Sequence, residues 1–90
     1  MDLNNVVKQS SDPISADVDG ELVMMSIERG NYYGLSGIGS RIWQLIETPV
    51  TVSALCDKLL QEYDVERSVC EVDVLEFLGK LAEQELIEVS

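Results

Sequence analysis

This 90-residue chain contains no histidine. The candidates that we consider for acid–base or nucleophilic chemistry are its carboxylates and its two cysteines. Histidine is the commonest general base and metal ligand, and it is the usual partner of a nucleophilic serine or cysteine. Acidic residues such as Asp17, Asp19 and Glu21 lie among apolar positions, in the pattern of an ordinary solvated surface. A small enzyme subunit with carboxylate chemistry is therefore the weakest interpretation, and we expect no catalytic residue.

Two short motifs resemble ligand-binding loops but lack essential parts of them. The sequence "DVDGE" at 17–21 lacks the later ligands and the bidentate glutamate of an EF-hand, and a tight hairpin turn at Asp19-Gly20 explains it better. The glycine-rich "GLSGIGS" at 34–40 opens a helix, but it has neither the lysine of a P-loop nor the full G-x-G-x-x-G spacing. We expect no metal and no cofactor.

The length and composition indicate one small cytoplasmic domain over residues 1–90, with an ordered core at about 14–89. No apolar run approaches the length of a membrane-spanning helix, and the N-terminus lacks the basic start and apolar core of a signal peptide. Cys56 and Cys70 lie in separate helical patterns outside any CxxC pair, which favours reduced, buried thiols. We expect neither membrane contact nor a disulfide.

The net charge restricts the class of partner. The formal charge of −11, from 17 acidic and 6 basic residues, opposes binding to a phosphate backbone, and the basic residues form no cluster. We therefore expect no nucleic acid partner. Plain solubility explains the acidic excess, and a neutral or basic polypeptide partner is the alternative.

Three strands are predicted in the first half of the chain. Residues 14–18 lead into the Asp-Gly turn, and 21–28 follow with apolar residues on both faces, which suits the middle of a sheet. The third strand is 31–36, which Asn31 opens. Because the second strand lies between the other two, the third is a sheet edge with unpaired amides and carbonyls. The segment "VVKQ" near residue 8 predicts a further short strand.

Three helices are predicted after the strands, where the apolar period changes to that of a helix. Their expected ranges are about 37–47, 52–64 and 69–84. Thr51 is placed to cap the second helix, and Ser68 with Glu71 fits a capping box at the start of the third. Met25 and Trp43 are expected in the core, and the final "LIEV" predicts a short strand or extended tail. This order indicates an α+β domain, with a three-stranded antiparallel sheet followed by three helices.

Three segments in this order resemble a known family. They are "DGELVMMSIERGNYYGLSGIGSRIW", "TVSALCDKLLQEYDV" and "DVLEFLGKLAEQELI". Together they are similar to the PqqD-like family, the precursor-peptide recognition elements of ribosomally made, post-translationally modified peptides. Within it, "YYGLSGIGSRIW" most resembles the stand-alone B1-type proteins of lasso peptide biosynthesis. The resemblance covers about residues 14–89.

The resemblance implies a winged-helix-like domain that binds the leader segment of a precursor peptide. In such proteins the leader adds as a strand to the edge of the third strand and lays side chains into the groove beside the third helix. The positions that match are Tyr32, Tyr33, Gly34 and Leu35 on the strand, and Asp73, Val74 and Phe77 on the helix.

The residues themselves agree with this interpretation. An exposed strand edge offers main-chain hydrogen bonds to an extended peptide, a mode of recognition called β-augmentation. Without a Cβ, Gly34 allows an incoming strand and the neighbouring helix to approach, and a bulge without a ligand is the alternative. Asp73 and Phe77 share a helix face with Lys80 one turn further on, so an acceptor, an apolar wall and an aliphatic stem are available there to a ligand. The alternative is that Phe77 is simply a core residue and Asp73 simply a solvated one.

The function expected from sequence is therefore a non-catalytic adaptor for a lasso peptide pathway. It binds the precursor leader and presents it to a leader peptidase, a transglutaminase-like cysteine protease, with a cyclase acting afterwards. The alternative is a winged-helix DNA-binding regulator, because the second and third predicted helices are able to imitate a helix-turn-helix. Net charge separates the two, and it favours the adaptor.

Overall fold

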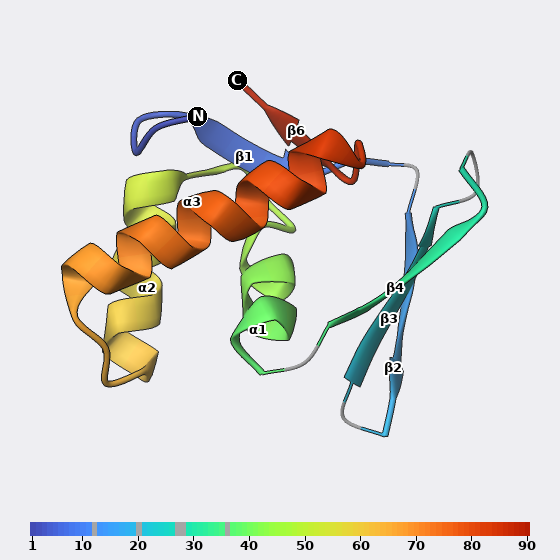
Figure 1. Cartoon of the computed structure of the whole chain (residues 1–90), viewed down its shortest axis with the longest axis horizontal. Coiled ribbons are helices and arrows are strands. Elements are labelled where there is room, and N and C mark those ends of the chain that lie inside the picture. The colour runs from blue at the N-terminus through green and yellow to red at the C-terminus, as the bar shows by residue number, and fades with distance from the viewer. Residues whose placement is uncertain (12, 20, 27–28, 36) are drawn as a thin grey trace.

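The computed structural model describes residues 1–11, 13–19, 21–26, 29–35 and 37–90. Figure 1 shows two parts, a three-stranded sheet at one side and a helical part at the other, with the two termini close together. In chain order the elements are β1 (Val6–Gln9), β2 (Ile14–Val18), β3 (Glu21–Ser26), β4 (Asn31–Leu35), α1 (Ile38–Leu45), β5 (Val50–Thr51), α2 (Val52–Glu62), α3 (Arg67–Glu83) and β6 (Ile87–Val89). The class is α+β, as expected.

The first sheet is an antiparallel meander in the order β2-β3-β4. The two-residue turn between Val18 and Glu21 is the predicted hairpin, and Asp19 adopts the positive φ of 52° that such a turn requires. Gly20, and residues 27–28 and 36 at the ends of the expected strands, lie outside the described part of the chain. β3 is the central strand, and β4 is an edge.

The second sheet, in the order β5-β1-β6, brings together three segments that are far apart in sequence. The "VVKQ" and "LIEV" strands were both expected, but their pairing was not. The amide of Val6 donates to the carbonyl of Ser90 at 3.0 Å, and the amide of Ser90 donates back at 2.9 Å. Because Val7 of β1 is fully buried, the core includes a segment that precedes residue 14.

The start of α3 corrects the predicted capping box. The helix begins at Arg67, the N-cap is Glu66, and no side chain caps it. The reason is that the Glu71 carboxylate accepts instead from Arg67 Nε at 2.8 Å, while Arg67 Nη1 donates to Asp57 of α2 at 2.6 Å. The cap expected for α2 is confirmed, since Thr51 Oγ1 accepts from the amide of Ala54 at 3.1 Å.

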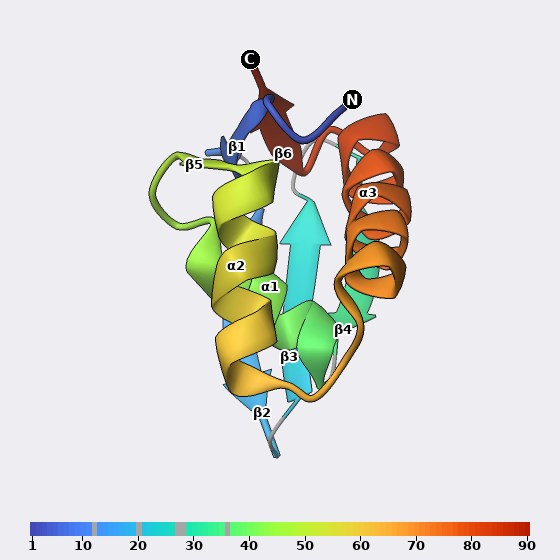
Figure 2. The ribbon, with the colours of Figure 1, turned by 90° about the vertical axis from the view of Figure 1, so that its left-hand side faces the viewer.

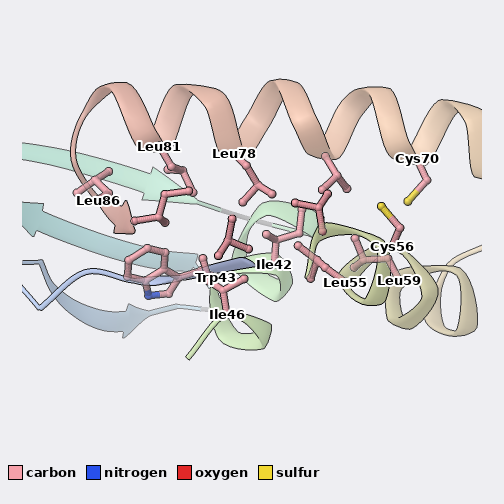
Figure 3. Packing of buried hydrophobic residues seen from close by; sticks show 14 of the residues in the cluster. Ile42, Trp43, Ile46, Leu55, Cys56, Leu59, Cys70, Leu78, Leu81 and Leu86 are labelled. Atoms are coloured by element: carbon pink, nitrogen blue, oxygen red, sulfur yellow. The ribbon is translucent and has the colours of Figure 1, made fainter. Parts of the chain in front are cut away.

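The core lies between the three helices and extends to the inner face of the first sheet, at Leu22 and Met24, and to the second sheet, at Val7 and Ile87. Figure 3 shows side chains of α1, α2 and α3 converging there, with the Cys56 and Cys70 sulfur atoms directed toward each other. Trp43 is buried as expected. The buried methionine of β3 is Met24, whereas Met25 is half-buried on the opposite face. Within the described residues, no helix has the length and apolar character needed to cross a membrane.

Candidate peptide-binding site

The free edge of β4 is the first component of the site. In the described part of the chain, β4 pairs with β3 on one side and with no strand on the other. In an antiparallel pair, alternate residues direct their backbone groups to the partner strand, so the remaining residues of β4 direct theirs to the open edge. Tyr33 and Leu35 lie opposite the buried Met24 and Leu22 of β3, whereas Tyr32 faces outward and is 74% exposed.

The third helix passes in front of this strand in the view of Figure 2, and Figure 1 shows that its C-terminal end is directed toward the first sheet. Contacts at two places along the C-terminal half of α3 connect it to β4. At one end Tyr33 Oη donates to Gln84 Oε1 at 2.8 Å. Nearer the middle of the helix, Phe77 of α3 and Leu35 of β4 both lie against Gly39 of α1. These two contacts bring β4 and the C-terminal half of α3 together at one surface.

An apolar cavity of about 250 Å³ opens next to this surface, between the three helices. Its described lining is Ile38, Gly39 and Ile42 of α1, Leu59 of α2, Tyr63 and Val65 of the following loop, and Val69, Cys70, Asp73, Val74 and Phe77 of α3. An engineered apolar cavity of roughly 150 Å³ is large enough to bind benzene, so this one has room for an aromatic or leucine side chain.

Two shallower hollows flank the cavity along α3, and Asp73 lines all three. One hollow, of about 230 Å³, is formed with Glu76, Phe77 and Lys80. The other, of about 310 Å³, is formed with Ser68, Val69 and Val72. Lys80 Nζ pairs with Glu76 at 3.5 Å, but among the described residues Asp73 has neither a hydrogen bond nor an ion pair. As far as the described residues show, the Asp73 carboxylate at the cavity mouth is therefore available to a ligand.

The structure brings most of the predicted site residues together. Asp73, Val74 and Phe77 converge on the cavity, with Lys80 at the adjacent hollow. Leu35 lies next to Phe77 at Gly39. Asn31 and Tyr33 lie near the C-terminal end of α3, away from the cavity, where Asn31 Nδ2 donates to Tyr33 Oη at 3.4 Å. Tyr32 and Gly34 lie on the opposite, outward face of the sheet, because they pair with Met25 and Val23.

The role expected for Gly34 toward the helix is wrong. A Cβ at Gly34 would have no atom within 4 Å, because the residue faces outward while α3 lies on the inner side. The glycine that permits close packing is Gly39, whose Cβ would lie 3.4 Å from Phe77 Cζ. Both glycines belong to the "GLSGIGS" stretch, and only the packing of α1 against α3 distinguishes them.

Sequence reasoning missed the contribution of α1 and α2 to the cavity, and it missed Gln84. Ile38 and Ile42 are four positions apart, so the sequence alone places them on one face of the predicted helix. Periodicity identifies the buried face of a helix but not the space left between three helices. The exposed Val69 carried a weaker signal, as an apolar residue in the polar half of α3.

The Cys56 thiol is a poor nucleophile. Burial, and after it the adjacent Cys70, raises the pKa of the Cys56 thiol to about 11. The thiolate is the reactive form of cysteine, so a thiol with this pKa is almost wholly unreactive at neutral pH. Among the described residues, no cluster of His, Cys, Asp or Glu is arranged to hold a metal ion.

The family model of coenzyme PQQ synthesis protein D (PqqD) matches residues 21–87, about three quarters of the chain. The chain belongs to the PqqD family. The match contains β3, β4 and all three helices, and therefore every residue of the candidate site. Among curated proteins, none matches this PqqD-family chain.

Two solved structures share its fold. The first is TbiB1 in complex with the TbiA(beta) leader peptide, which is 40% identical, with a TM-score of 0.83 over 90% of this chain and 94% of TbiB1. The second is a lasso peptide synthetase B1 complexed with its leader peptide, which is 22% identical, with a TM-score of 0.81 over 91% and 96% of the two chains. Within the PqqD-like family, the chain is thus similar to the B1 proteins of lasso peptide biosynthesis.

Proposed function

We propose that this protein binds the leader segment of a ribosomally made precursor peptide in lasso peptide biosynthesis. The leader adds as a strand to the free edge of β4. The observation that carries the proposal is the open edge of β4 beside an apolar cavity on α3, in a chain 40% identical to a leader-binding protein. Backbone hydrogen bonds supply affinity in this mode, and pockets for alternate side chains supply specificity.

The cavity at α3 supports a second contact, with one apolar leader side chain. Burying a side chain of leucine or phenylalanine size contributes about 1.5–3 kcal/mol. Phe77 and Val74 form the wall, and Asp73 at the mouth provides a hydrogen-bond acceptor or countercharge. Lys80 covers the adjacent hollow with its aliphatic stem. Asn31, Tyr33 and Leu35 face the leader from the groove side of β4, whereas Tyr32 and Gly34 take part through the backbone edge.

An adaptor also needs a surface for the enzyme that it serves, and the outward face of the β2-β3-β4 sheet is a suitable one. Ile14 and Val18 of β2 and Tyr32 of β4 point outward and are more than half exposed. Ser15 and Asp17 of β2 point inward, opposite buried residues of β3. This is the reverse of the usual pattern, in which polar residues face the solvent. The apolar side of β2 therefore serves something other than the core.

We assign this face to the leader peptidase of the pathway. A second copy of the chain is the poorer occupant, because two copies would bring together formal charges of −11 each. Tyr32 belongs to the same strand that offers its edge to the leader, so an enzyme docked here would lie next to the bound precursor. The adaptor then contributes proximity alone, by raising the local concentration of precursor at the protease, and the cyclase acts on the product.

A winged-helix regulator is the less favourable function, because the charge of −11 opposes the counterion release that drives DNA binding. At physiological salt we expect negligible retention of duplex DNA in a mobility assay.

The function is tested with two mixtures. In the first, the purified protein and a labelled leader peptide should form a complex by fluorescence anisotropy, and the peptide mass should remain unchanged. In the second, addition of the leader peptidase should give faster cleavage than the peptidase alone. Cleavage by the protein without peptidase would contradict the adaptor, and so would an absence of leader binding.

A further inference from the structure

Gln84 lies at the end of the groove away from the cavity, and it links the helix to the strand. It is the C-cap residue of α3, it is half-buried, and its Oε1 accepts from Tyr33 Oη at 2.8 Å. The two residues are 51 positions apart in sequence. Gln84 therefore joins the two elements between which the leader is proposed to lie.

The hydroxyl of Tyr33 is held from two sides. It donates its one proton to Gln84 and accepts from Asn31 Nδ2 at 3.4 Å. Asn31 and Tyr33 lie on the same face of β4, because successive side chains of a strand alternate. A tyrosine hydroxyl with both its donor and an acceptor position in use fixes the orientation of its ring. The Tyr33 ring is thereby held in one position at the wall of the groove.

The backbone of Gln84 is positioned independently of its side chain. The amide of Glu85 donates to the carbonyl of Ala82 at 3.0 Å, and the amide of Leu86 donates to that of Leu81 at 3.0 Å, which is a Schellman motif. Glu85 adopts the corresponding left-handed conformation, with φ of 58°. A substitution of the Gln84 side chain therefore removes the link to β4 and leaves the end of the helix in place.

We infer that Gln84 is a positioning residue for leader recognition, which acts through Tyr33 and makes its ring ready for the incoming strand. This inference rests on the proposed function. Without the Gln84 acceptor, the Tyr33 ring is free to move and has to be ordered when the leader binds. Immobilising one such side chain lowers affinity by roughly 3- to 10-fold.

The experiment is a double-mutant cycle on leader affinity. Gln84→Met keeps the length of the side chain and removes the strong acceptor, and Tyr33→Phe removes the same hydrogen bond from the strand. The probe titrated by fluorescence anisotropy is the TbiA(beta) leader peptide. Thermal unfolding of each variant is measured in the same buffer.

The expected result is a loss of about 3- to 10-fold for each single variant, with a double variant no weaker than either single one. Gln84→Glu retains an acceptor for the hydroxyl, and it should bind within about 2-fold of the original protein. Equal losses for Gln84→Met and Gln84→Glu, or losses that multiply in the double variant, would overturn the role of Gln84. If Gln84→Met unfolds, Tyr33→Phe still decides, since unchanged affinity in that variant rejects the inference. If the original protein does not bind this probe, the proposed function itself fails.

Discussion

A substitution that fills the cavity from its mouth separates leader binding from folding. Val69 lines the cavity, but its side chain is 50% exposed, so the fold does not depend on it. In Val69→Phe, the larger ring is able to enter the adjacent apolar space of about 250 Å³ without displacing a buried group. The ring then occupies the position that we assign to a leader side chain.

The expected size of the effect follows from the area that the leader can no longer bury. Full burial of one large apolar side chain contributes about 1.5–3 kcal/mol, so its loss weakens binding roughly 10- to 150-fold. Substitution at an exposed position changes stability little, within about ±0.5 kcal/mol, and the added apolar contact acts in the stabilising direction.

The assay is a titration of the labelled leader by anisotropy, together with chemical unfolding of the same samples. Val89→Phe is the matched control, since Val89 is 40% exposed on β6 and does not line the cavity. This control should bind the leader normally, which excludes a general effect of added apolar surface. Normal affinity in Val69→Phe, with stability unchanged, would show that the leader does not use the cavity.

Three further predictions follow from individual side chains. Asp73→Asn should weaken leader binding by about 1.5–3 kcal/mol without loss of stability. Glu47→Gln removes the same charge at an exposed position outside the cavity, and it should leave leader binding unchanged. If the two variants bind the leader with equal affinity by anisotropy, Asp73 is not part of the site. Glu85→Gly should raise the free energy of unfolding, measured by urea denaturation, by roughly 0.5–1 kcal/mol, because glycine adopts the positive φ of 58° without strain. A decrease would mean that loss of the exposed Arg29–Glu85 ion pair at 3.2 Å costs more stability than the relieved backbone strain adds. The pKa of Cys56 is raised from 9.0 to about 11 in the folded protein, so the thiol of the unfolded chain ionises first as the pH rises. The free energy of unfolding should therefore fall between these pH values, by at most about 1.4 kcal/mol per pH unit. If Cys56→Ala shows the same pH dependence of stability, the Cys56 thiol is not its cause.

The features that the sequence determined by itself are local ones. The Asp19-Gly20 pair predicts a two-residue hairpin because of its backbone preferences, and the strands on either side pair in that register. The change from a period of two to a period of 3.6 after residue 36 places the three helices. The chain order of β2, β3 and β4 leaves β4 at an edge of the sheet. The strand that a leader would pair with was therefore predictable from the sequence.

The features that only the tertiary structure decided depend on residues that are far apart in the chain. The β5-β1-β6 sheet joins segments near residues 7, 50 and 88, and no local pattern specifies that pairing. The third helix begins at Arg67 and not at residue 69, because Arg67 binds Asp57 of another helix in place of the capping box that the local sequence favours.

The site follows the same division. Asp73, Val74 and Phe77 were found through one helix and one family resemblance, but the cavity that they border exists only because three helices pack with a gap between them. Gly34 and Gly39 look equivalent in sequence, and the face on which each lies decides that Gly39 meets Phe77 while Gly34 meets solvent. The Tyr33–Gln84 link spans 51 residues and depends on where α3 ends relative to β4. Periodicity and turn preferences act within one element, whereas the shape between elements results from the packing of all of them together.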